Sequence, residues 1–184
     1  MTRVWLIRHG ESMRAEGTAI SVTDPPLTDQ GLADAHILAA TMAARPLVRV
    51  LSSDRERALA TARVVAEPHR LQVESSAALR EIDFGAWEGR SLADLWSEEP
   101  EAAKAWELDI RSTPASFGES LRDLEGRVAM FWAGLRPLPR RGEVAIVAHR
   151  GSLAALRALI TGSTVADAFA SELELGAAVQ VVAS

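Results

Sequence analysis

The sequence predicts an α/β fold: a three-layer α/β/α sandwich around a mainly parallel sheet, with one antiparallel edge strand. Strand-like runs alternate with helical patterns along most of the chain, which is typical of parallel strands connected through helices. Three of these runs are continuously apolar or β-branched, as expected when helices cover both faces of a sheet.

Five segments are predicted to be strands, because each is a short apolar or β-branched run. They are 3–7, 48–52, 71–74, 143–148 and 177–182. If the last of these lies at a sheet edge, its unpaired backbone groups offer a pairing surface. The sequence is therefore compatible with a homodimer that pairs through this strand.

Four helical patterns lie between the strands, with apolar residues recurring every three or four positions. They cover about 32–42, 58–66, 121–135 and 153–160. Pro68 follows the second pattern and Gly162 the fourth, and both residues are typical of positions just past a helix end.

The segment from about 84 to 120 interrupts this alternation. It holds three of the five tryptophans and the turn-forming stretch STPASFGES. We expect a short helical insertion there, over one end of the sheet, within a single domain that spans residues 1–184.

Composition and charge exclude several classes of protein. The 184 residues carry a net charge of −5, which disfavours duplex nucleic acid as a partner. The chain has no cysteine, so a cysteine nucleophile and a cysteine-ligated zinc site are excluded. No apolar run resembles a secretion signal or a membrane span, and we expect a cytoplasmic protein without membrane contact.

Polar residues follow the predicted strands where a ligand would bind. Arg8 and His9 come after the first strand, Arg57 lies in the first turn of the helix after the second, and His149 follows the fourth. In open α/β sheets, ligands bind beyond the carboxyl ends of the strands, and helix N-termini favour anions there. Two arginines and two histidines at this edge predict a phosphate site.

Each of these residues also has an ordinary structural explanation when it is taken alone. His9 could be a polar residue satisfied at a strand end, and His149 could cap a helix. Arg57 could be a solvated helix charge paired with Asp54. Their coincidence at one edge of the predicted sheet favours the phosphate site.

Six motifs occur in the order in which one protein family carries them. They are LIRHGES, DPPLTDQGLADA, SSDRERALATA, LREIDFGAWEG, FGES and VAHRGSLAAL. The chain thereby resembles the histidine phosphatase superfamily, the phosphoglycerate mutase-like proteins, along nearly its whole length. It looks closest to small members such as the α-ribazole phosphate phosphatases.

The resemblance implies that His9 attacks phosphorus and becomes a phosphohistidine, which water then hydrolyses. It implies that Arg8, Arg57 and His149 hold the phosphoryl oxygens, and that Glu81 protonates the leaving group. An imidazole nucleophile must be neutral, so we expect its other ring nitrogen to donate to a backbone carbonyl. This mechanism requires no metal and no other cofactor.

The proton donor has alternatives. Outside its motif, Glu81 would be a surface glutamate paired with Arg80 or another arginine. Glu88 lies in the same segment and is the second candidate for the donor. His36 and His69 lie outside the motifs and are not expected in the site.

Further substrate contacts are expected from Gly10, Ser12 and Arg150. Gly10 gives the backbone room for a close approach of the ligand. Two positions depart from the common family pattern: Ala15 stands where many relatives carry asparagine, and Arg150 precedes Gly151 where they often carry two glycines. Arg150 either adds a positive charge at the pocket mouth or points into solvent.

These observations favour a phosphomonoester phosphatase that acts on a small phosphorylated metabolite. A cofactor-primed phosphoglycerate mutase uses the same phosphohistidine and is the first alternative. The short insertion leaves less material to enclose a mutase intermediate. A non-catalytic phosphate-sensing or interaction protein on the same scaffold is the second alternative.

Overall fold

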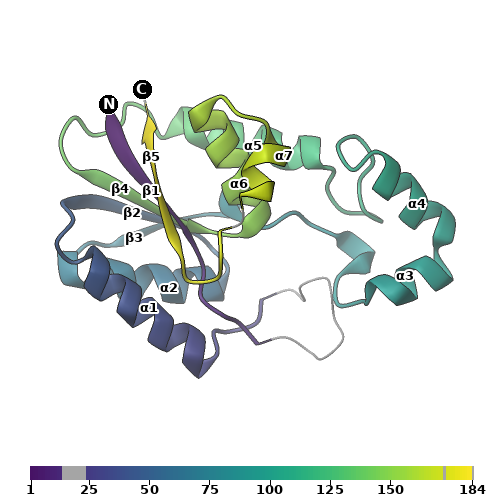
Figure 1. The fold of residues 1–184 in the computed structure, drawn as a ribbon, viewed down its shortest axis with the longest axis horizontal. Helices are drawn as coiled ribbons and strands as arrows, with labels where there is room; N and C mark the ends of the chain where they lie inside the picture. The colour runs from purple at the N-terminus through teal and green to yellow at the C-terminus, as the bar shows by residue number, and fades with distance from the viewer. Residues whose placement is uncertain (14–23, 172, 184) are drawn as a thin grey trace.

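The computed structural model describes residues 1–13, 24–171 and 173–183, and a five-stranded sheet forms its centre (Figure 1). The strands are β1 (Thr2–Arg8), β2 (Leu47–Ser53), β3 (Val73–Ser76), β4 (Glu143–Ala148) and β5 (Ala178–Ala183). All five predicted strands are confirmed, each within two residues of its expected bounds.

The sheet has the strand order β3-β2-β4-β1-β5. The pairs β1–β4, β2–β4 and β2–β3 are parallel, and β5 pairs antiparallel with β1. The predicted antiparallel strand therefore lies at an edge of the sheet. Every residue of the central strand β4 is buried, which explains its apolar run from Val144 to Ala148.

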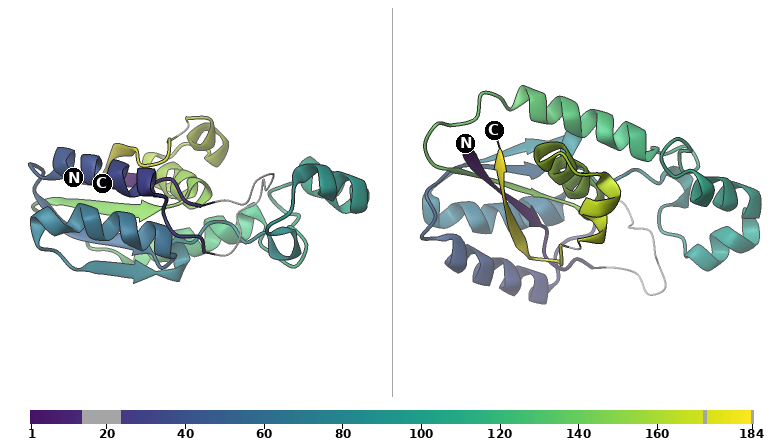
Figure 2. Two further views of the ribbon diagram at one scale, coloured as in Figure 1. Left: turned by 90° about the horizontal axis from the view of Figure 1, so that it is seen from below. Right: turned by 45° about the horizontal axis from the view of Figure 1, so that its top comes forward.

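Helices cover both faces of the sheet and make the predicted three layers (Figure 2). On one face, α1 (Asp29–Met42) and α2 (Glu56–Ala66) pack on alternate strand residues such as Ile7, Val50 and Val147. On the other face, α5 (Leu121–Gly134) and α6 (Arg150–Thr161) pack on residues such as Leu6, Leu51 and Ile146.

The four predicted helices are confirmed, and the structure adds a short helix, α7 (Val165–Ala170), which packs on α6 through Ala168. Its six residues are too few to show a clear periodicity in the sequence.

The stretch that interrupts the alternation forms short helices, as expected. After β3 come two 3₁₀ helices, η2 (Ala77–Leu79) and η3 (Gly85–Trp87), and then α3 (Leu92–Glu98) and α4 (Pro100–Leu108). The helices α3 and α4 extend beyond one end of the sheet (Figures 1 and 2). Trp87, Leu95 and Ala115 form a small apolar cluster there, separate from the two main cores.

Among the helices that the structure describes, none is long and apolar enough to cross a bilayer.

Two glycines allow a close contact between the end of β1 and the start of α1. A Cβ atom on Gly10 would lie 2.5 Å from the carbonyl oxygen of Gly31, and a Cβ atom on Gly31 would lie 2.1 Å from the carbonyl oxygen of Glu11. Real Cβ atoms do not approach backbone this closely, so both positions require glycine. This contact fixes the backbone that carries His9.

We expect Gly31→Ala to lower the free energy of unfolding by about 2 kcal/mol, because the methyl group would displace the backbone of Glu11. The higher helix propensity of alanine offsets only about 1 kcal/mol of this effect. Urea denaturation measures the change. Gly126→Ala in α5 is the matched control: its Cβ would meet nothing within 4 Å, so this variant should be slightly more stable. Equal stability changes in the two variants would contradict the close contact.

Candidate active site

His9 follows the last residue of β1 and is buried, with 5% of its surface exposed. Its backbone N–H donates to the carbonyl of Ala148 at 3.1 Å, so the pairing of β1 with β4 continues through it. The Nδ1 atom lies 2.7 Å from the carbonyl oxygen of Gly10. Because a carbonyl oxygen only accepts, Nδ1 carries the proton, and Nε2 keeps its lone pair in the neutral ring. The expected tautomer is confirmed.

Arg57, in the first turn of α2, faces this lone pair. Its Nε–H donates to Nε2 of His9 at 3.3 Å. The side chain is buried, and its guanidinium lies 3.6 Å from the carboxylate of Asp24, which also accepts from the backbone N–H of Glu56 at 2.8 Å. The alternative pairing of Arg57 with Asp54 is wrong. Asp54 forms its ion pair with Arg80 instead.

His149 follows β4 and is the N-cap residue of α6. It is 1% exposed, and its ring centroid lies 5.0 Å from that of His9. Its Nε2 atom lies 2.9 Å from the hydroxyl oxygen of Ser53, the last residue of β2. Of the four residues expected at this edge, His9, Arg57 and His149 lie close together at the carboxyl ends of β1, β2 and β4.

The surroundings of His149 keep its ring neutral. Burial is the main cause that holds the pKa of His149 well below its ordinary value of 6.5, and electrostatic repulsion from His9 and then from Arg57 adds to it. The neutral ring of His149 therefore adds no positive charge beside His9, the candidate nucleophile, where Arg57 already supplies one.

The low pKa of His149 makes the stability depend on pH. Below about pH 6.5 the unfolded chain binds a proton at this residue that the folded protein excludes, so acid favours the unfolded state. We expect the free energy of unfolding to fall as the pH drops from about 7 to about 5, and to fall less steeply in His149→Asn. Urea denaturation across this range measures both slopes. Parallel slopes would show that His149 titrates normally.

Glu81 lies between η2 and η3 and contacts the start of α6. Its two carboxylate oxygens accept from the backbone N–H of Gly151 at 3.0 and 3.1 Å, and one of them also accepts from the N–H of Ile82. A Cβ atom on Gly151 would lie 2.4 Å from Oε1 of Glu81, so a side chain at this position would displace the carboxylate. The alternative pairing of Glu81 with Arg80 is wrong, because Arg80 binds Asp54 through two bonds of 2.8 and 2.5 Å.

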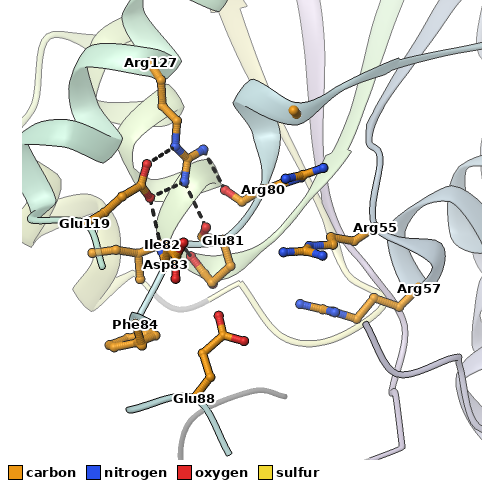
Figure 3. Close-up of a pocket in the computed structure, with 11 residues that line it drawn as sticks. Arg55, Arg57, Arg80, Glu81, Ile82, Asp83, Phe84, Glu88, Glu119 and Arg127 are labelled. Carbon is orange, nitrogen blue, oxygen red and sulfur yellow. Dashed lines mark hydrogen bonds and ion pairs between the residues drawn. The ribbon is translucent and has the colours of Figure 1, made fainter. Parts of the chain in front are cut away.

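A cavity of about 220 Å³ lies beside these residues (Figure 3). Arg55 and Arg57 project into it from one side, and Glu81 and Glu88 approach from the other (Figure 3). Burial, and then the charge of Asp83, raises the pKa of Glu88 above its ordinary value, although the two arginines oppose this. Glu88 therefore keeps a proton more readily than a solvent-exposed glutamate.

The remaining residues expected in the site lie apart from the cavity or contact other parts of the fold. Arg8 donates to the carbonyl of Leu173 at 3.0 Å and does not line the cavity. The backbone N–H of Gly10 donates to the hydroxyl of Thr61 at 3.1 Å. Ser12 is buried and forms an isolated β-bridge with Leu27. Ala15 lies outside the described residues.

Arg150 does not line the cavity. Its guanidinium lies over the ring of Phe169 in α7, 4.0 Å from the ring centroid. The expected contact between Arg150 and the substrate is therefore not supported by the position of this side chain. The second glycine of the pattern, Gly151, is the residue that contacts Glu81.

Several contributing residues were not predicted from the sequence. Ser53 contacts His149, Thr61 accepts from the backbone of Gly10, and Asp24 pairs with Arg57. Ser53 and Thr61 lie within the SSDRERALATA motif, so the motif itself was the available signal. Asp24 begins the motif DPPLTDQGLADA, but nothing in the sequence pairs it with Arg57, which lies in another motif.

Within the described ranges, no group of three or more histidine, aspartate or glutamate side chains is arranged to hold a metal ion.

Comparison with known proteins gives one consistent answer. The model of the histidine phosphatase superfamily (branch 1) matches residues 4–183. The adenosylcobalamin/alpha-ribazole phosphatase of Salmonella typhimurium is 33% identical over 175 residues, which are 95% of this chain and 87% of that protein.

Two solved structures have the same fold. The alpha-ribazole phosphatase of Shigella flexneri superposes with a TM-score of 0.86 at 32% identity, covering 97% of this chain and 89% of that one. A mycobacterial glucosyl-3-phosphoglycerate phosphatase superposes with a TM-score of 0.83 at 30% identity, with the same coverage of both chains.

Proposed function

Because this chain belongs to the histidine phosphatase superfamily, branch 1, and is a phosphomonoesterase for small phosphorylated metabolites, we propose that it works through a phosphohistidine at His9. The observation that supports this most directly is the hydrogen bond from Nδ1 of His9 to the carbonyl of Gly10. It leaves the Nε2 lone pair facing Arg57, whose side chain lines a cavity together with other arginines and carboxylates.

In the first step, Nε2 of His9 attacks phosphorus, and the bond from phosphorus to the leaving oxygen breaks. The Nε2 lone pair that now accepts from Arg57 forms the new bond. The guanidinium of Arg57 then binds the oxygens of the transferring group, where negative charge is spread. Arg8 and His149 share this role in the proposal.

The leaving oxygen takes its proton from Glu81, which lies on the cavity side of the site. In the second step, the Glu81 carboxylate removes a proton from water, and the resulting hydroxide displaces His9 from phosphorus. Inorganic phosphate leaves, and both residues return to their starting states. Glu88 remains the second candidate for the donor, because burial raises the pKa of its carboxyl.

The alcohol half of the substrate occupies the cavity between the arginines and the carboxylates in this proposal. A volume of about 220 Å³ suits the small alcohol half of a metabolite rather than a phosphorylated protein surface. The relatives are named for different phosphorylated metabolites, so the class of substrate carries over and the individual compound does not.

A panel of phosphorylated metabolites tests the proposal. We expect release of inorganic phosphate from p-nitrophenyl phosphate and from at least one metabolite, undiminished by a chelator. Interconversion of 2- and 3-phosphoglycerate, primed by bisphosphoglycerate, would identify a mutase instead. Binding without turnover across the whole panel would identify a phosphate sensor, and loss of activity to the chelator would indicate a metal enzyme.

A further inference from the structure

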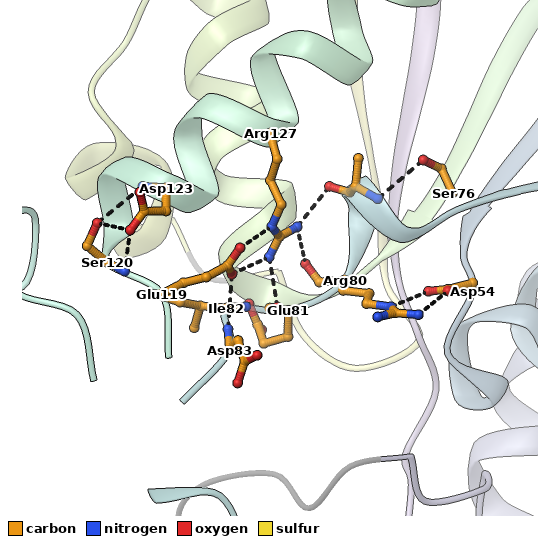
Figure 4. Close-up of polar contacts among 11 residues, drawn as sticks. Asp54, Ser76, Arg80, Glu81, Ile82, Asp83, Glu119, Ser120, Asp123 and Arg127 are labelled. Carbon is orange, nitrogen blue, oxygen red and sulfur yellow. Dashed lines mark hydrogen bonds and ion pairs between the residues drawn. The ribbon is translucent and has the colours of Figure 1, made fainter. Parts of the chain in front are cut away.

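The guanidinium of Arg127, in α5, makes five hydrogen bonds to the segment that carries Glu81 and to one carboxylate (Figure 4). Three of them go to the backbone carbonyl oxygens of Ala78, Arg80 and Glu81, each at 2.8 Å. This arginine therefore contacts the backbone just before and at the candidate proton donor. None of these contacts involves the Glu81 carboxylate itself.

The carboxylate of Glu119 completes this arrangement. It binds Arg127 through two bonds of 2.7 and 2.8 Å, and it accepts from the backbone N–H of Asp83 at 3.1 Å. The backbone N–H of Glu119 also donates to the carbonyl of Asp83 at 2.7 Å. The Arg127–Glu119 pair thus contacts the chain on both sides of Glu81, from Ala78 to Asp83.

The pair is itself fixed to the fold. Glu119 directly precedes Ser120, whose side chain and backbone exchange hydrogen bonds with Asp123 in a capping box at the start of α5. Arg127 lies two turns further along the same helix, and both Arg127 and Glu119 line the cavity (Figures 3 and 4). The paired side chains are mostly buried, at 21% and 24% exposure, so water competes weakly for their bonds.

The Glu81 carboxylate needs such support because its own contacts are few. Within the described residues, it accepts hydrogen bonds from the backbone N–H groups of Gly151 and Ile82. A shift of its backbone by about 1 Å would move the carboxyl away from a leaving oxygen, and such displacements cost about 10²-fold in rate. The backbone contacts of Arg127 oppose that shift.

We propose that Arg127 and Glu119 are positioning residues for the proton donor, which hold the 78–83 segment so that Glu81 faces the leaving oxygen. This proposal rests on the assignment of Glu81 as the donor in the proposed function. It also gives the FGES motif a role: its glutamate ties α5 to the segment that carries the acid.

The test compares two substrates of similar shape, p-nitrophenyl phosphate and phenyl phosphate. Because p-nitrophenolate leaves without a proton and phenolate needs one, a defect in proton donation slows the second substrate selectively. We expect Arg127→Met to lower kcat/KM for phenyl phosphate about 10²-fold and to leave kcat/KM for p-nitrophenyl phosphate within about threefold. This ratio reports the first step alone, because the hydrolysis of the phosphohistidine is common to both substrates. Arg127→Lys keeps the charge but not the five bonds, and should give an intermediate ratio.

Three further variants make the result decisive. Glu81→Gln should show the same selectivity, and adding Arg127→Met to it should cost little more on phenyl phosphate, because both changes remove one function. Glu119→Gln keeps the shape of the pair and provides a milder change if Arg127→Met does not fold. Arg122→Met, an exposed position of the same helix, is the matched control and should leave both substrates unchanged.

An equal loss on both substrates in Arg127→Lys and Glu119→Gln, with Glu81→Gln selective, would overturn the positioning role and leave the proposed function intact. If Glu81→Gln itself showed no selectivity, Glu81 would not be the donor and the positioning role would be wrong, whereas the phosphohistidine at His9 would stand with Glu88 as the candidate donor.

Discussion

Replacing His9 by alanine should abolish phosphatase activity, with kcat/KM for p-nitrophenyl phosphate falling by about 10⁴-fold or more. The variant lacks the Nε2 atom that receives the phosphoryl group. A water molecule in its place would not be oriented as the imidazole is, by one hydrogen bond to the carbonyl of Gly10 and one from Arg57. Residual activity at a higher level would mean that the nucleophile lies elsewhere.

Trapping the intermediate gives a second measurement of the same prediction. Rapid quenching of the wild-type enzyme with phosphorus-labelled substrate should yield a protein-bound label that acid removes and base does not. His9→Ala should carry no label. His36→Ala is the matched control, because His36 is exposed on α1 and lies outside the site motifs, and this variant should behave as the wild type.

Replacing Arg57 by methionine should lower kcat by about 10³-fold while the protein remains folded. Arginine contacts to a transferring phosphoryl group stabilise the charge that spreads over its oxygens, and methionine fills a similar volume without a charge. The Arg57 side chain is only 5% exposed, so water would compete little for its bonds to phosphate. Steady-state kinetics on p-nitrophenyl phosphate measure the loss.

The fold should tolerate this change, because the ion-pair partner Asp24 is 36% exposed and water can solvate it when the guanidinium is gone. Arg63→Met provides the control on the same helix. Arg63 is exposed and pairs with Glu56 at the surface, where an ion pair contributes little, so its loss should leave both activity and stability nearly unchanged. If Arg57→Met matched this control in kcat, Arg57 would not contact the transferring phosphoryl group.

Together, the site residues come from segments that the sheet brings to one edge. β1 supplies His9, β2 and α2 supply Ser53 and Arg57, and β4 supplies His149. This is the carboxyl edge of parallel strands, where a ligand meets helix N-termini as well as side chains. Glu81 arrives from outside the sheet, so its position depends on contacts with α5 and α6.

The sequence by itself determined the five strands, the four principal helices and the edge at which His9, Arg57 and His149 meet. Each of these follows from local information. Apolar periodicity distinguishes strands from helices and shows which residues are buried, and the end of a strand places the next residue at the edge of the sheet. The short helix α7 was not predicted, because six residues do not complete two turns and show no clear periodicity.

Only the tertiary structure decided how the charges pair. Arg57 binds Asp24 and Arg80 binds Asp54, whereas the sequence allowed Arg57 to pair with Asp54 and Glu81 with Arg80. It also placed Arg150 on Phe169 and put Arg127 behind the candidate acid. A long arginine side chain reaches several neighbours, and which of them lies within hydrogen-bond distance depends on the packing of segments far apart in the chain. Local patterns carry no information about that packing.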